Sequence, residues 1–184
     1  MMIAQYQDVI LREFEERDIP LKVEWINNPN NNEFLHYELP VRVDKTTKWF
    51  HEKDNSKRLD CTIEYQGVPV GVIGLLQIDR DNSKAEYYIT VGNQSYKNKG
   101  IATKATRAIL NYAFETLKLH KVYLTVDARN EIAIRLYEKS GFVREGYFID
   151  DLYCAKKSEF IDRKRCAVVK NRGGGKTLLH NNKI

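Results

Sequence analysis

AEYYITVGNQSYKNKGIATKATRA, residues 85–108, is the stretch that decides the fold. It begins with β-branched and aromatic residues typical of a strand at 85–91 and continues through a polar loop to Gly100. Beyond Gly100, apolar residues recur with helical spacing at Ile101, Ala105, Ala108, Ile109 and Tyr112. The stretch therefore predicts a strand, a loop and a helix in direct succession.

The loop before this helix has the features of an anion site. The first-turn amides of a helix have no partner within the helix, and here they run from Asn98 to Thr103. Gly100 and Ala102 carry too little side chain to block an approaching ligand. From these residues alone, a phosphate site and a simple helix entry both remain open.

A second strand, KVYLTV at 121–126, follows the helix expected over 100–117. Strand, helix and strand form a βαβ unit, whose two strands are expected to be parallel. The anion site then lies at the carboxyl end of the first strand, where open α/β sheets generally bind ligands.

The rest of the chain supplies further strands and short helices. Asp18 is expected to cap a helix that contains Trp25, and Asp44 a helix that runs through Phe50. Gly71 and Gly74 indicate a bulge, a close backbone approach or plain packing within a strand. The remaining strands are expected at 9–14, 58–66, 68–78 and near 159–169.

Residues 127–142 predict another short amphipathic helix. Asn130 is a good N-cap, and Gly141 is a C-terminal stop before Phe142. Its apolar stripe consists of Ile132, Ala133, Leu136 and Tyr137.

Two motifs in these segments resemble those of the GCN5-related N-acetyltransferase (GNAT) family. Residues 97–102, KNKGIA, are similar to the family's pyrophosphate motif Gln/Arg-x-x-Gly-x-Gly/Ala, with Lys97 in place of Gln or Arg. The family's second hallmark, Asn-x-x-Ala-x-x-x-Tyr-x-x-x-Gly-Phe, is matched by Asn130, Ala133, Tyr137, Gly141 and Phe142. The resemblance covers residues 9–169 and is closest to the branch of ribosomal-protein N-terminal and spermidine acetyltransferases.

The resemblance implies an α/β (α+β) domain over residues 1–169. Its mixed sheet has six to seven strands: the N-terminal strands are antiparallel, and a parallel βαβ pair forms the acetyl-CoA cleft. Acetyl-CoA is the implied co-substrate, and no metal is implied. The residues expected to contact acetyl-CoA are Val91, Lys97, Asn98, Lys99, Gly100, Ile101, Ala102, Thr103 and Asn130.

The implied reaction is direct attack of a primary amine on acetyl-CoA in a ternary complex. A free alkylamine has a pKa of about 10, so the enzyme must remove a proton, stabilise an oxyanion and protonate the departing thiolate. The resemblance assigns the thiolate's proton to Tyr137 and points to a backbone amide near Val91 for the oxyanion. Glu86 is the candidate base, with His36 and Glu33 as weaker ones. A core-packed tyrosine and a solvated glutamate are the alternative interpretations.

The acceptor is left open among a polyamine, a protein N-terminus and an amino sugar. The segment from Asn28 to Val41 is the expected substrate-facing region, with Glu33 and His36 as substrate-binding candidates, although a packed surface loop explains it equally well. Glu38, Asp150 and Asp151 can add negative charge for a polycation. A non-catalytic acyl-CoA-binding module is the rival class, and a homodimer is common in the family.

Charge and composition limit the classes of binding partner that we expect. The net charge is +5, but residues 170–184 carry four basic residues and no acid, so the preceding body is nearly neutral. We expect no nucleic-acid binding, and we expect 170–184 to be a flexible basic tail in which GGGKT at 173–177 is not a functional Walker A loop. No apolar stretch approaches membrane-spanning length. The three cysteines are scattered, which favours neither disulfides nor a zinc site. From these two observations we expect a cytoplasmic protein.

Overall fold

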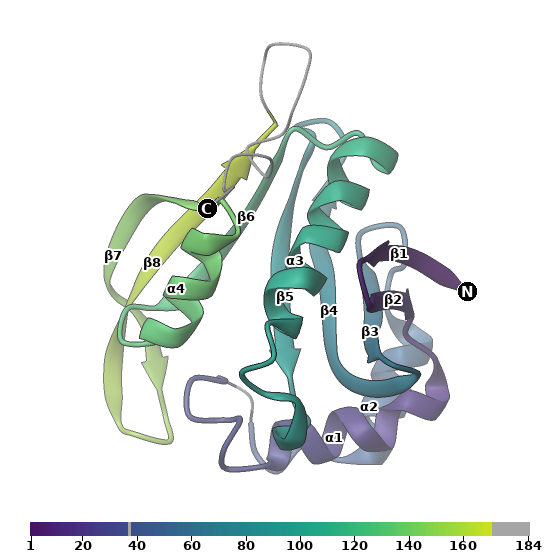
Figure 1. Cartoon of the computed structure of the whole chain (residues 1–184). Helices are drawn as coiled ribbons and strands as arrows, with labels where there is room; N and C mark the ends of the chain where they lie inside the picture. The colour runs from purple at the N-terminus through teal and green to yellow at the C-terminus, as the bar shows by residue number, and fades with distance from the viewer. Residues whose placement is uncertain (37, 171–184) are drawn as a thin grey trace.

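The computed structural model describes residues 1–36 and 38–170. Eight strands form one sheet in the order β1-β2-β3-β4-β5-β6-β8-β7, and among them only β5 and β6 run parallel as neighbours (Figure 1). The strands are β1 (Met2–Tyr6), β2 (Val9–Glu13), β3 (Leu59–Tyr65), β4 (Val68–Asp79), β5 (Lys84–Val91), β6 (Lys121–Asp127), β7 (Val143–Cys154) and β8 (Glu159–Val169).

Helices cover both faces of the sheet. On one face lie α3 (Ile101–Asn111), continued by the π-helical segment η3 (Tyr112–Thr116), and α4 (Glu131–Lys139); on the other lie α1 (Ile19–Asn27) and α2 (Val43–Glu52) (Figure 1). The short 3-10 helices η1 (Glu16–Asp18) and η2 (Gln94–Tyr96) precede α1 and α3. Two successive residues of β4 mark the two layers, because successive strand residues face opposite ways: Ile73 packs in the α3 core and Val72 in the α1 core.

The α/β (α+β) fold with antiparallel N-terminal strands and one parallel βαβ pair is confirmed. The sheet, however, has eight strands instead of six to seven. The strands not expected from sequence are β1 and β7, one at each edge of the sheet. Neither buries a continuous face, and β7 has two register shifts, so neither shows the apolar alternation by which strands are recognised.

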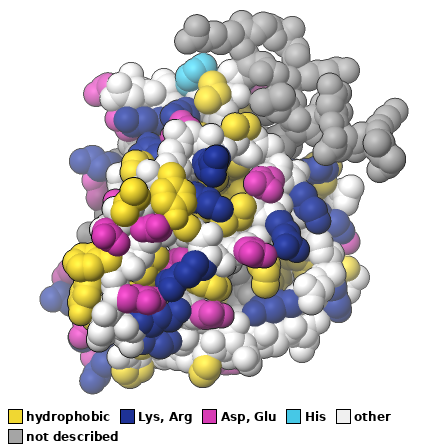
Figure 2. All heavy atoms as spheres, turned by 90° about the vertical axis from the view of Figure 1, so that its left-hand side faces the viewer, with side chains coloured by type: hydrophobic (Ala, Val, Ile, Leu, Met, Phe, Trp, Pro, Cys, Tyr) yellow, Lys and Arg dark blue, Asp and Glu magenta, His cyan; other side chains and the backbone are white. Residues whose placement is uncertain are grey.

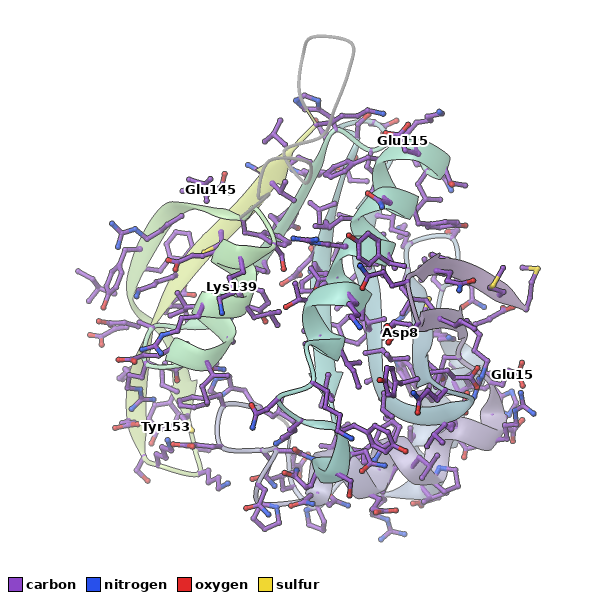
Figure 3. All side chains as sticks on the ribbon, in the orientation of Figure 1. Asp8, Glu15, Glu115, Lys139, Glu145 and Tyr153 are labelled. Atoms are coloured by element: carbon purple, nitrogen blue, oxygen red, sulfur yellow. The ribbon has the colours of Figure 1, made fainter. Side chains whose placement is uncertain are left out.

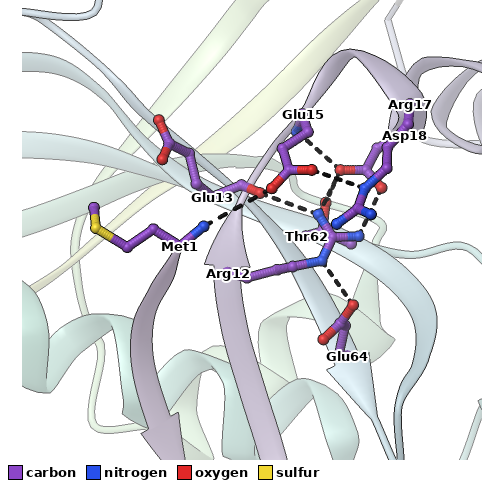
Figure 4. A network of polar contacts seen from close by, with 8 residues as sticks. All are labelled: Met1, Arg12, Glu13, Glu15, Arg17, Asp18, Thr62 and Glu64. Atoms are coloured by element: carbon purple, nitrogen blue, oxygen red, sulfur yellow. Dashed lines mark hydrogen bonds and ion pairs between the residues drawn. The ribbon is translucent and has the colours of Figure 1, made fainter.

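Of three expected helix caps, one is confirmed in full, one in position only, and one is wrong. Asp18 is the N-cap residue of α1, as expected, but its carboxylate makes no capping bond and accepts instead from Arg12 and from the Glu15 amide (Figure 4). Asp44 lies inside the first turn of α2, whose N-cap is Arg42. Asn130 does cap α4, since its Oδ1 accepts from the amide of Ala133 at 3.1 Å.

Gly71 and Gly74 are places of close backbone approach. A Cβ atom at Gly71 would lie 2.3 Å from the Thr90 carbonyl oxygen, and one at Gly74 would lie 2.2 Å from the Leu59 carbonyl oxygen. Both glycines therefore allow β4 to sit tightly between its neighbouring strands.

The feature that positions the site is the separation of β5 from β6. They pair only from Lys84 to Glu86 against Lys121 to Tyr123, although β5 continues to Val91 and β6 to Asp127. Beyond the paired residues, β6 stays hydrogen-bonded to β8 while β5 stays with β4. The carboxyl ends of two parallel strands are thus left unpaired with each other.

The β7–β8 hairpin exposes apolar and charged side chains side by side. Figure 2 views the molecule from this side and shows hydrophobic groups among Lys, Arg, Asp and Glu. Glu145, labelled in Figure 3, accepts from Lys121 at 2.6 Å and from Arg165 at 2.9 Å. The exposed apolar residues of this hairpin are Val143, Tyr147, Phe148, Ile149, Tyr153, Phe160 and Val169.

The end of the described chain is attached to the domain. Lys170 Nζ donates to the Phe114 carbonyl oxygen at 3.0 Å and lies 3.1 Å from Glu115. The other residues of the expected tail, including GGGKT at 173–177, lie outside the described residues. Within residues 1–36 and 38–170, no helix is long and apolar enough to cross a membrane.

Candidate active site

The loop that leads into α3, residues 92–100, which we call the donor loop, ends at a row of free amides that continues into the first turn of the helix. Gly100 is the N-cap of α3 at φ +71°, and a Cβ there would meet no atom within 4 Å. The first backbone bond into the helix is from Lys104 N to Gly100 O at 3.1 Å. In the described part of the chain, no amide from Asn98 to Thr103 donates to another group. These amides are available to an anion, as the sequence predicted.

The side chains of the predicted donor motif lie on both sides of this row. Ile101 is buried in the core, so that only its backbone can meet a ligand. Lys97 Nζ donates to the Asn30 carbonyl oxygen at 3.2 Å, and partial burial lowers the pKa of Lys97. Lys99 Nζ lies 4.9 Å from the centre of the Tyr96 ring. Ala102 and Thr103 are half-buried.

The side chain of Lys104, in the first turn of α3, is directed away from the row of free amides. Its Nζ donates to Asp8 at 2.6 Å, and Asp8 lies in the turn between β1 and β2 (Figure 3). This contact ties α3 to the β1–β2 hairpin.

Val91 ends β5 with its backbone turned toward the β6 side. Antiparallel residues alternate between pairs that exchange hydrogen bonds and pairs that do not. Gly92 N donates to Val70 O at 3.0 Å, so the adjacent pair of Val91 and Gly71 is a non-bonded one. The Val91 amide therefore points away from β4, toward the region where β5 and β6 have separated.

Tyr137 extends from α4 into the core, and its hydroxyl has no partner among the residues that the structure describes. Its ring packs edge-on against Tyr87 at 5.9 Å and against Phe142 at 5.8 Å between centroids. Burial raises the pKa of Tyr137 well above its usual value. In contrast to the Tyr87 hydroxyl, which bonds Thr106 at 2.7 Å, the Tyr137 hydroxyl makes no hydrogen bond to any described residue. It remains a protonated donor without a partner.

Glu86 occupies the last paired position of β5, opposite Tyr123 of β6. Its Oε2 accepts from Gln77 Nε2 at 3.1 Å at the surface. A strand advances about 3.3 Å per residue, so Glu86 lies about 16 Å along β5 from Val91. Asn130, the other predicted motif residue, uses its side-chain oxygen in the α4 cap, as described above.

Residues 28–36, which we call the acceptor loop, cross from the end of β5 to the β7–β8 turn. On the β5 side, Asn31 Nδ2 donates to the Gly92 carbonyl oxygen at 2.8 Å. On the other side, Lys156 Nζ donates to Asn32 Oδ1 at 3.2 Å, and Lys157 Nζ lies 5.7 Å from the centre of the Phe34 ring. Glu33, between Asn32 and Phe34 in the chain, is exposed.

His36, at the end of the acceptor loop, lies among charged groups of β6 and the β7–β8 hairpin. Burial lowers the pKa of His36, the neighbouring Asp127 carboxylate raises it, and the cations Arg163, Lys157 and Arg129 lower it. The net shift is downward, which favours a neutral imidazole near pH 7.

Sequence reasoning missed two residues of this region. Asp127 is the last residue of β6, the strand that separates from β5. It is buried, and its carboxylate accepts hydrogen bonds from Arg129. A carboxylate at the carboxyl end of a parallel strand is a signal that was available. Asn31 stands in a run of asparagines that gave no signal, because its partners are distant in sequence.

The cysteines and the acidic residues form no metal site in the described part of the chain. Among residues 1–36 and 38–170, no group of three or more His, Cys, Asp or Glu side chains is placed to hold a metal ion. Cys61, Cys154 and Cys166 are free, and burial raises the pKa of Cys61 to about 12.

Comparison with known proteins identifies the family. Residues 8–143 match the family model described as the acetyltransferase (GNAT) domain. This chain belongs to the GNAT acetyltransferases. As a GNAT enzyme it is an N-acetyltransferase that uses acetyl-CoA, which confirms the class and the donor predicted from the two motifs.

Curated relatives of this GNAT enzyme include spermidine N(1)-acetyltransferases. The Vibrio cholerae protein is 29% identical over 168 residues, which cover 88% of this chain and 93% of the relative. The Escherichia coli K12 protein is 36% identical over 103 residues, 56% of this chain and 54% of the relative. A putative ribosomal N-acetyltransferase of Bacillus subtilis is 34% identical over 107 residues, which cover 57% of each chain.

A solved structure shares the whole GNAT architecture. The Vibrio cholerae spermidine N-acetyltransferase in complex with CoA and spermine matches with a TM-score of 0.80 and 27% identity, over 88% of this chain and 95% of that one. A dodecameric structure of the same enzyme matches with a TM-score of 0.72 and 26% identity, over 88% and 94%.

Proposed function

We propose that this GNAT enzyme transfers the acetyl group of acetyl-CoA to a primary amine of a polyamine. The observation that carries the proposal is the similarity, over 88% of the chain, to a spermidine N-acetyltransferase whose structure holds CoA and spermine. Protein N-termini and amino sugars are the other acceptors that the chemistry allows, and the experiment below distinguishes them.

Charge around the acceptor loop supports a cationic acceptor. Glu33 and Glu38 are exposed and form no ion pair with any residue in the described ranges. By contrast, Asp127 is neutralised by Arg129 and Asp151 by Arg163, so these two carboxylates are already occupied. Glu33, on the segment that crosses between β5 and the β7–β8 turn, is the substrate-binding carboxylate that we assign, with His36 of the same loop as a second candidate.

We assign the catalytic roles to three groups. The amide of Val91, directed toward the separation of β5 and β6, would receive the developing oxyanion, and the Tyr137 hydroxyl would protonate the departing thiolate. Glu86 would take the amine's proton. Because Glu86 lies about 16 Å from Val91 along the strand, we assign this transfer to a water chain rather than to direct contact. The donor-loop amides, with the backbone around Gly100, would hold the pyrophosphate.

The test is a thiol-release assay with acetyl-CoA and a panel of amines. The panel contains spermidine, spermine, putrescine, glucosamine and a peptide with a free N-terminus. We expect the highest kcat/KM with spermidine or spermine, because both present several cations to exposed carboxylates. A preference for the peptide or the amino sugar would overturn the polyamine assignment.

A charge-removing pair of variants makes the assay specific for the acceptor loop. Glu33→Gln is expected to raise KM for spermidine about 3- to 10-fold, which is the effect of weakening one charged contact. Asp81→Asn is the matched control, because Asp81 is an exposed acid in the turn at the opposite end of β5. Equal effects of the two substitutions would mean that only overall charge matters.

We also propose that the enzyme is a homo-oligomer, a homodimer at the least, and that it works in the cytoplasm. The outer edge of β7 has no strand neighbour in the described sheet, and its exposed apolar residues stand among charges of both signs, which suits a second copy of the same surface. Three free cysteines fit a reducing compartment.

Sedimentation tests the proposed oligomer. It should show an oligomer that Ile149→Asp, a change on β7, dissociates. Val43→Asp, a change at an exposed residue of α2, should leave the oligomer intact.

A further inference from the structure

The donor loop and the acceptor loop are joined by hydrogen bonds between residues more than sixty positions apart. Asn31 Nδ2 donates to Gly92 O at 2.8 Å, and Gln94 Nε2 donates to Asn31 Oδ1 at 2.5 Å. Lys97 Nζ adds a third bond, to Asn30 O at 3.2 Å. Three residues of the donor loop therefore contact two successive residues of the acceptor loop.

Asn31 is the centre of this junction. Besides bonding Gly92, its Nδ2 donates to the carbonyl oxygen of Trp25 in α1 at 3.0 Å, so that both amide hydrogens and the oxygen are in use. The next residue, Asn32, is bonded to Lys156 of the β7–β8 turn. Glu33 follows directly, so its position depends on how Asn31 and Asn32 are held.

The donor loop is the part of the site at which we place the pyrophosphate. Its own amides from Asn98 onward are unbonded, and Asn98 at φ +61° and Gly100 at φ +71° both have left-handed backbone. An anion that bonds these amides restricts the loop. Because Gln94 and Lys97 belong to the same loop, that restriction extends to Asn30 and Asn31.

We propose that Asn31 is a positioning residue that couples occupancy of the acetyl-CoA site to the order of the acceptor loop. Donor binding at the amides of residues 98–103 holds Gln94 and Lys97 in place, and these hold the acceptor loop through Asn30 and Asn31. The ordering of the acceptor loop is then partly complete before the amine arrives, which raises the affinity for the amine when the donor is bound. The inference rests on the proposed function for the place of the pyrophosphate and for the contact of the acceptor loop with the amine.

The role assigned to Lys97 follows from the same contacts. In the family's motif this position is usually Gln or Arg, whereas here the lysine amine reaches the acceptor loop. A long, flexible side chain with a single charged donor can bond a carbonyl oxygen in the neighbouring loop while its backbone stays in the donor motif.

Hydrogen–deuterium exchange with CoA alone tests the coupling without any amine. In the wild type, saturating CoA should slow exchange of the amides of residues 30–34 about 10-fold, within the usual range of coupling between sites. In Asn31→Ala and in Gln94→Ala the slowing should fall below about 2-fold, while CoA still protects residues 98–103. The proposal is wrong if CoA leaves residues 30–34 unprotected in the wild type. It is also wrong if CoA protects these residues in the two variants as strongly as it does in the wild type.

Asn28→Ala is the matched control for a merely loosened loop. Asn28 Oδ1 accepts from the Asn30 amide at 3.0 Å, a bond within the acceptor loop that does not reach the donor loop. This variant should keep the CoA-dependent protection. Loss of protection in Asn28→Ala to the same extent as in Asn31→Ala would also overturn the proposal.

Steady-state kinetics supplies the second measurement. Asn31→Ala should raise KM for the best amine of the panel about 5-fold or more, with KM for acetyl-CoA changed less than about 2-fold. Changes of equal size in both KM values would contradict the coupling. The exchange experiment does not use an amine, so it separates failure of this inference from failure of the polyamine assignment.

Discussion

Arg12 and Asp18 face each other through two parallel hydrogen bonds: Arg12 Nη1 donates to Asp18 Oδ2 and Nη2 to Oδ1, each at 2.7 Å (Figure 4). Arg12 Nε also donates to Glu64 at 2.6 Å, and the Thr62 hydroxyl donates to Asp18 at 2.9 Å. Arg12, Asp18 and Thr62 are each less than a tenth exposed. The cluster ties β2 and β3 to the segment that enters α1.

Asp18→Ala should lower the free energy of unfolding by about 3 kcal/mol. The substitution leaves a buried guanidinium without its main carboxylate, and loss of one partner of a buried pair is costly. Urea denaturation measures the change. Arg17→Ala is the control: Arg17 pairs with Glu15 at 2.7 Å but is exposed, so its loss should change stability by less than about 0.5 kcal/mol. Similar effects of the two substitutions would mean that burial of the Arg12–Asp18 pair contributes nothing to the free energy of unfolding.

Asp60 should make stability depend on pH in the acid range. Burial alone would raise the pKa of Asp60, but hydrogen bonds from Arg58, Tyr88 and Lys53 outweigh it and lower the pKa to about 2. A carboxylate whose folded pKa lies below its unfolded value stabilises the fold above about pH 4, and this stability is lost as the pH falls through about 2. The shift corresponds to about 2 kcal/mol.

Asp60→Asn isolates this contribution. The variant is less stable than the wild type at pH 6, and the difference in unfolding free energy should shrink by about 2 kcal/mol between pH 5 and pH 2. Denaturant titrations at a series of pH values provide the measurement. A difference that stays constant over this range would show that the Asp60 carboxylate is not selectively stabilised in the folded state.

Gly100→Glu should weaken binding of acetyl-CoA more than Gly100→Gln. Both side chains are strained at φ +71°, and the space around a Cβ there is open within the protein, so the two variants share the same structural cost. Only glutamate places a negative charge beside the amides that would hold the pyrophosphate. Calorimetry should give a dissociation constant about 10-fold higher for the glutamate variant, with the gap narrowing at high salt. Equal constants would place the pyrophosphate elsewhere.

Tyr137→Phe should lower kcat about 10²- to 10⁴-fold without changing the melting temperature. The substitution removes the hydroxyl, which makes no hydrogen bond to any residue in the described ranges, so we expect no loss of stability. Since burial raises the pKa of Tyr137 well above its usual value, the acid stays protonated at neutral and mildly alkaline pH, so the wild-type kcat should not fall from its deprotonation below about pH 9.

The matched control for Tyr137 is Tyr87→Phe, which removes the bond to Thr106 in the same aromatic cluster. It should lower stability by about 1 kcal/mol and leave kcat nearly unchanged. Should the folded Tyr137→Phe variant keep more than half of the wild-type kcat under conditions where chemistry is rate-limiting, another group protonates the thiolate.

The parts of the site that are continuous in sequence could be predicted from sequence. The strand ending at Val91, the helix that Gly100 opens and the Asn130 cap of α4 are each set by neighbouring residues, through propensity, periodicity and capping. These signals were sufficient for the βαβ unit, the row of free amides and the family. They also placed Tyr137 on the apolar stripe of α4.

The parts that escaped prediction depend on residues far apart in the chain. The edge strands β1 and β7 bury no continuous face and so leave no alternation. Asp18 has good cap chemistry, yet Arg12 and Thr62 take its carboxylate. Such competition between partners is invisible until the chain is folded.

The sequence by itself determined the class of enzyme, the fold class and the row of free amides before α3, because each of these is encoded by residues within about twenty positions of one another. The tertiary structure alone decided where β5 leaves β6, which way the Val91 amide points, and that Asn31 bonds Gly92 and Gln94 while Lys97 bonds Asn30. The physical reason is that a loop's position is set by hydrogen bonds to distant groups, and single polar side chains carry no periodicity that would reveal their partners.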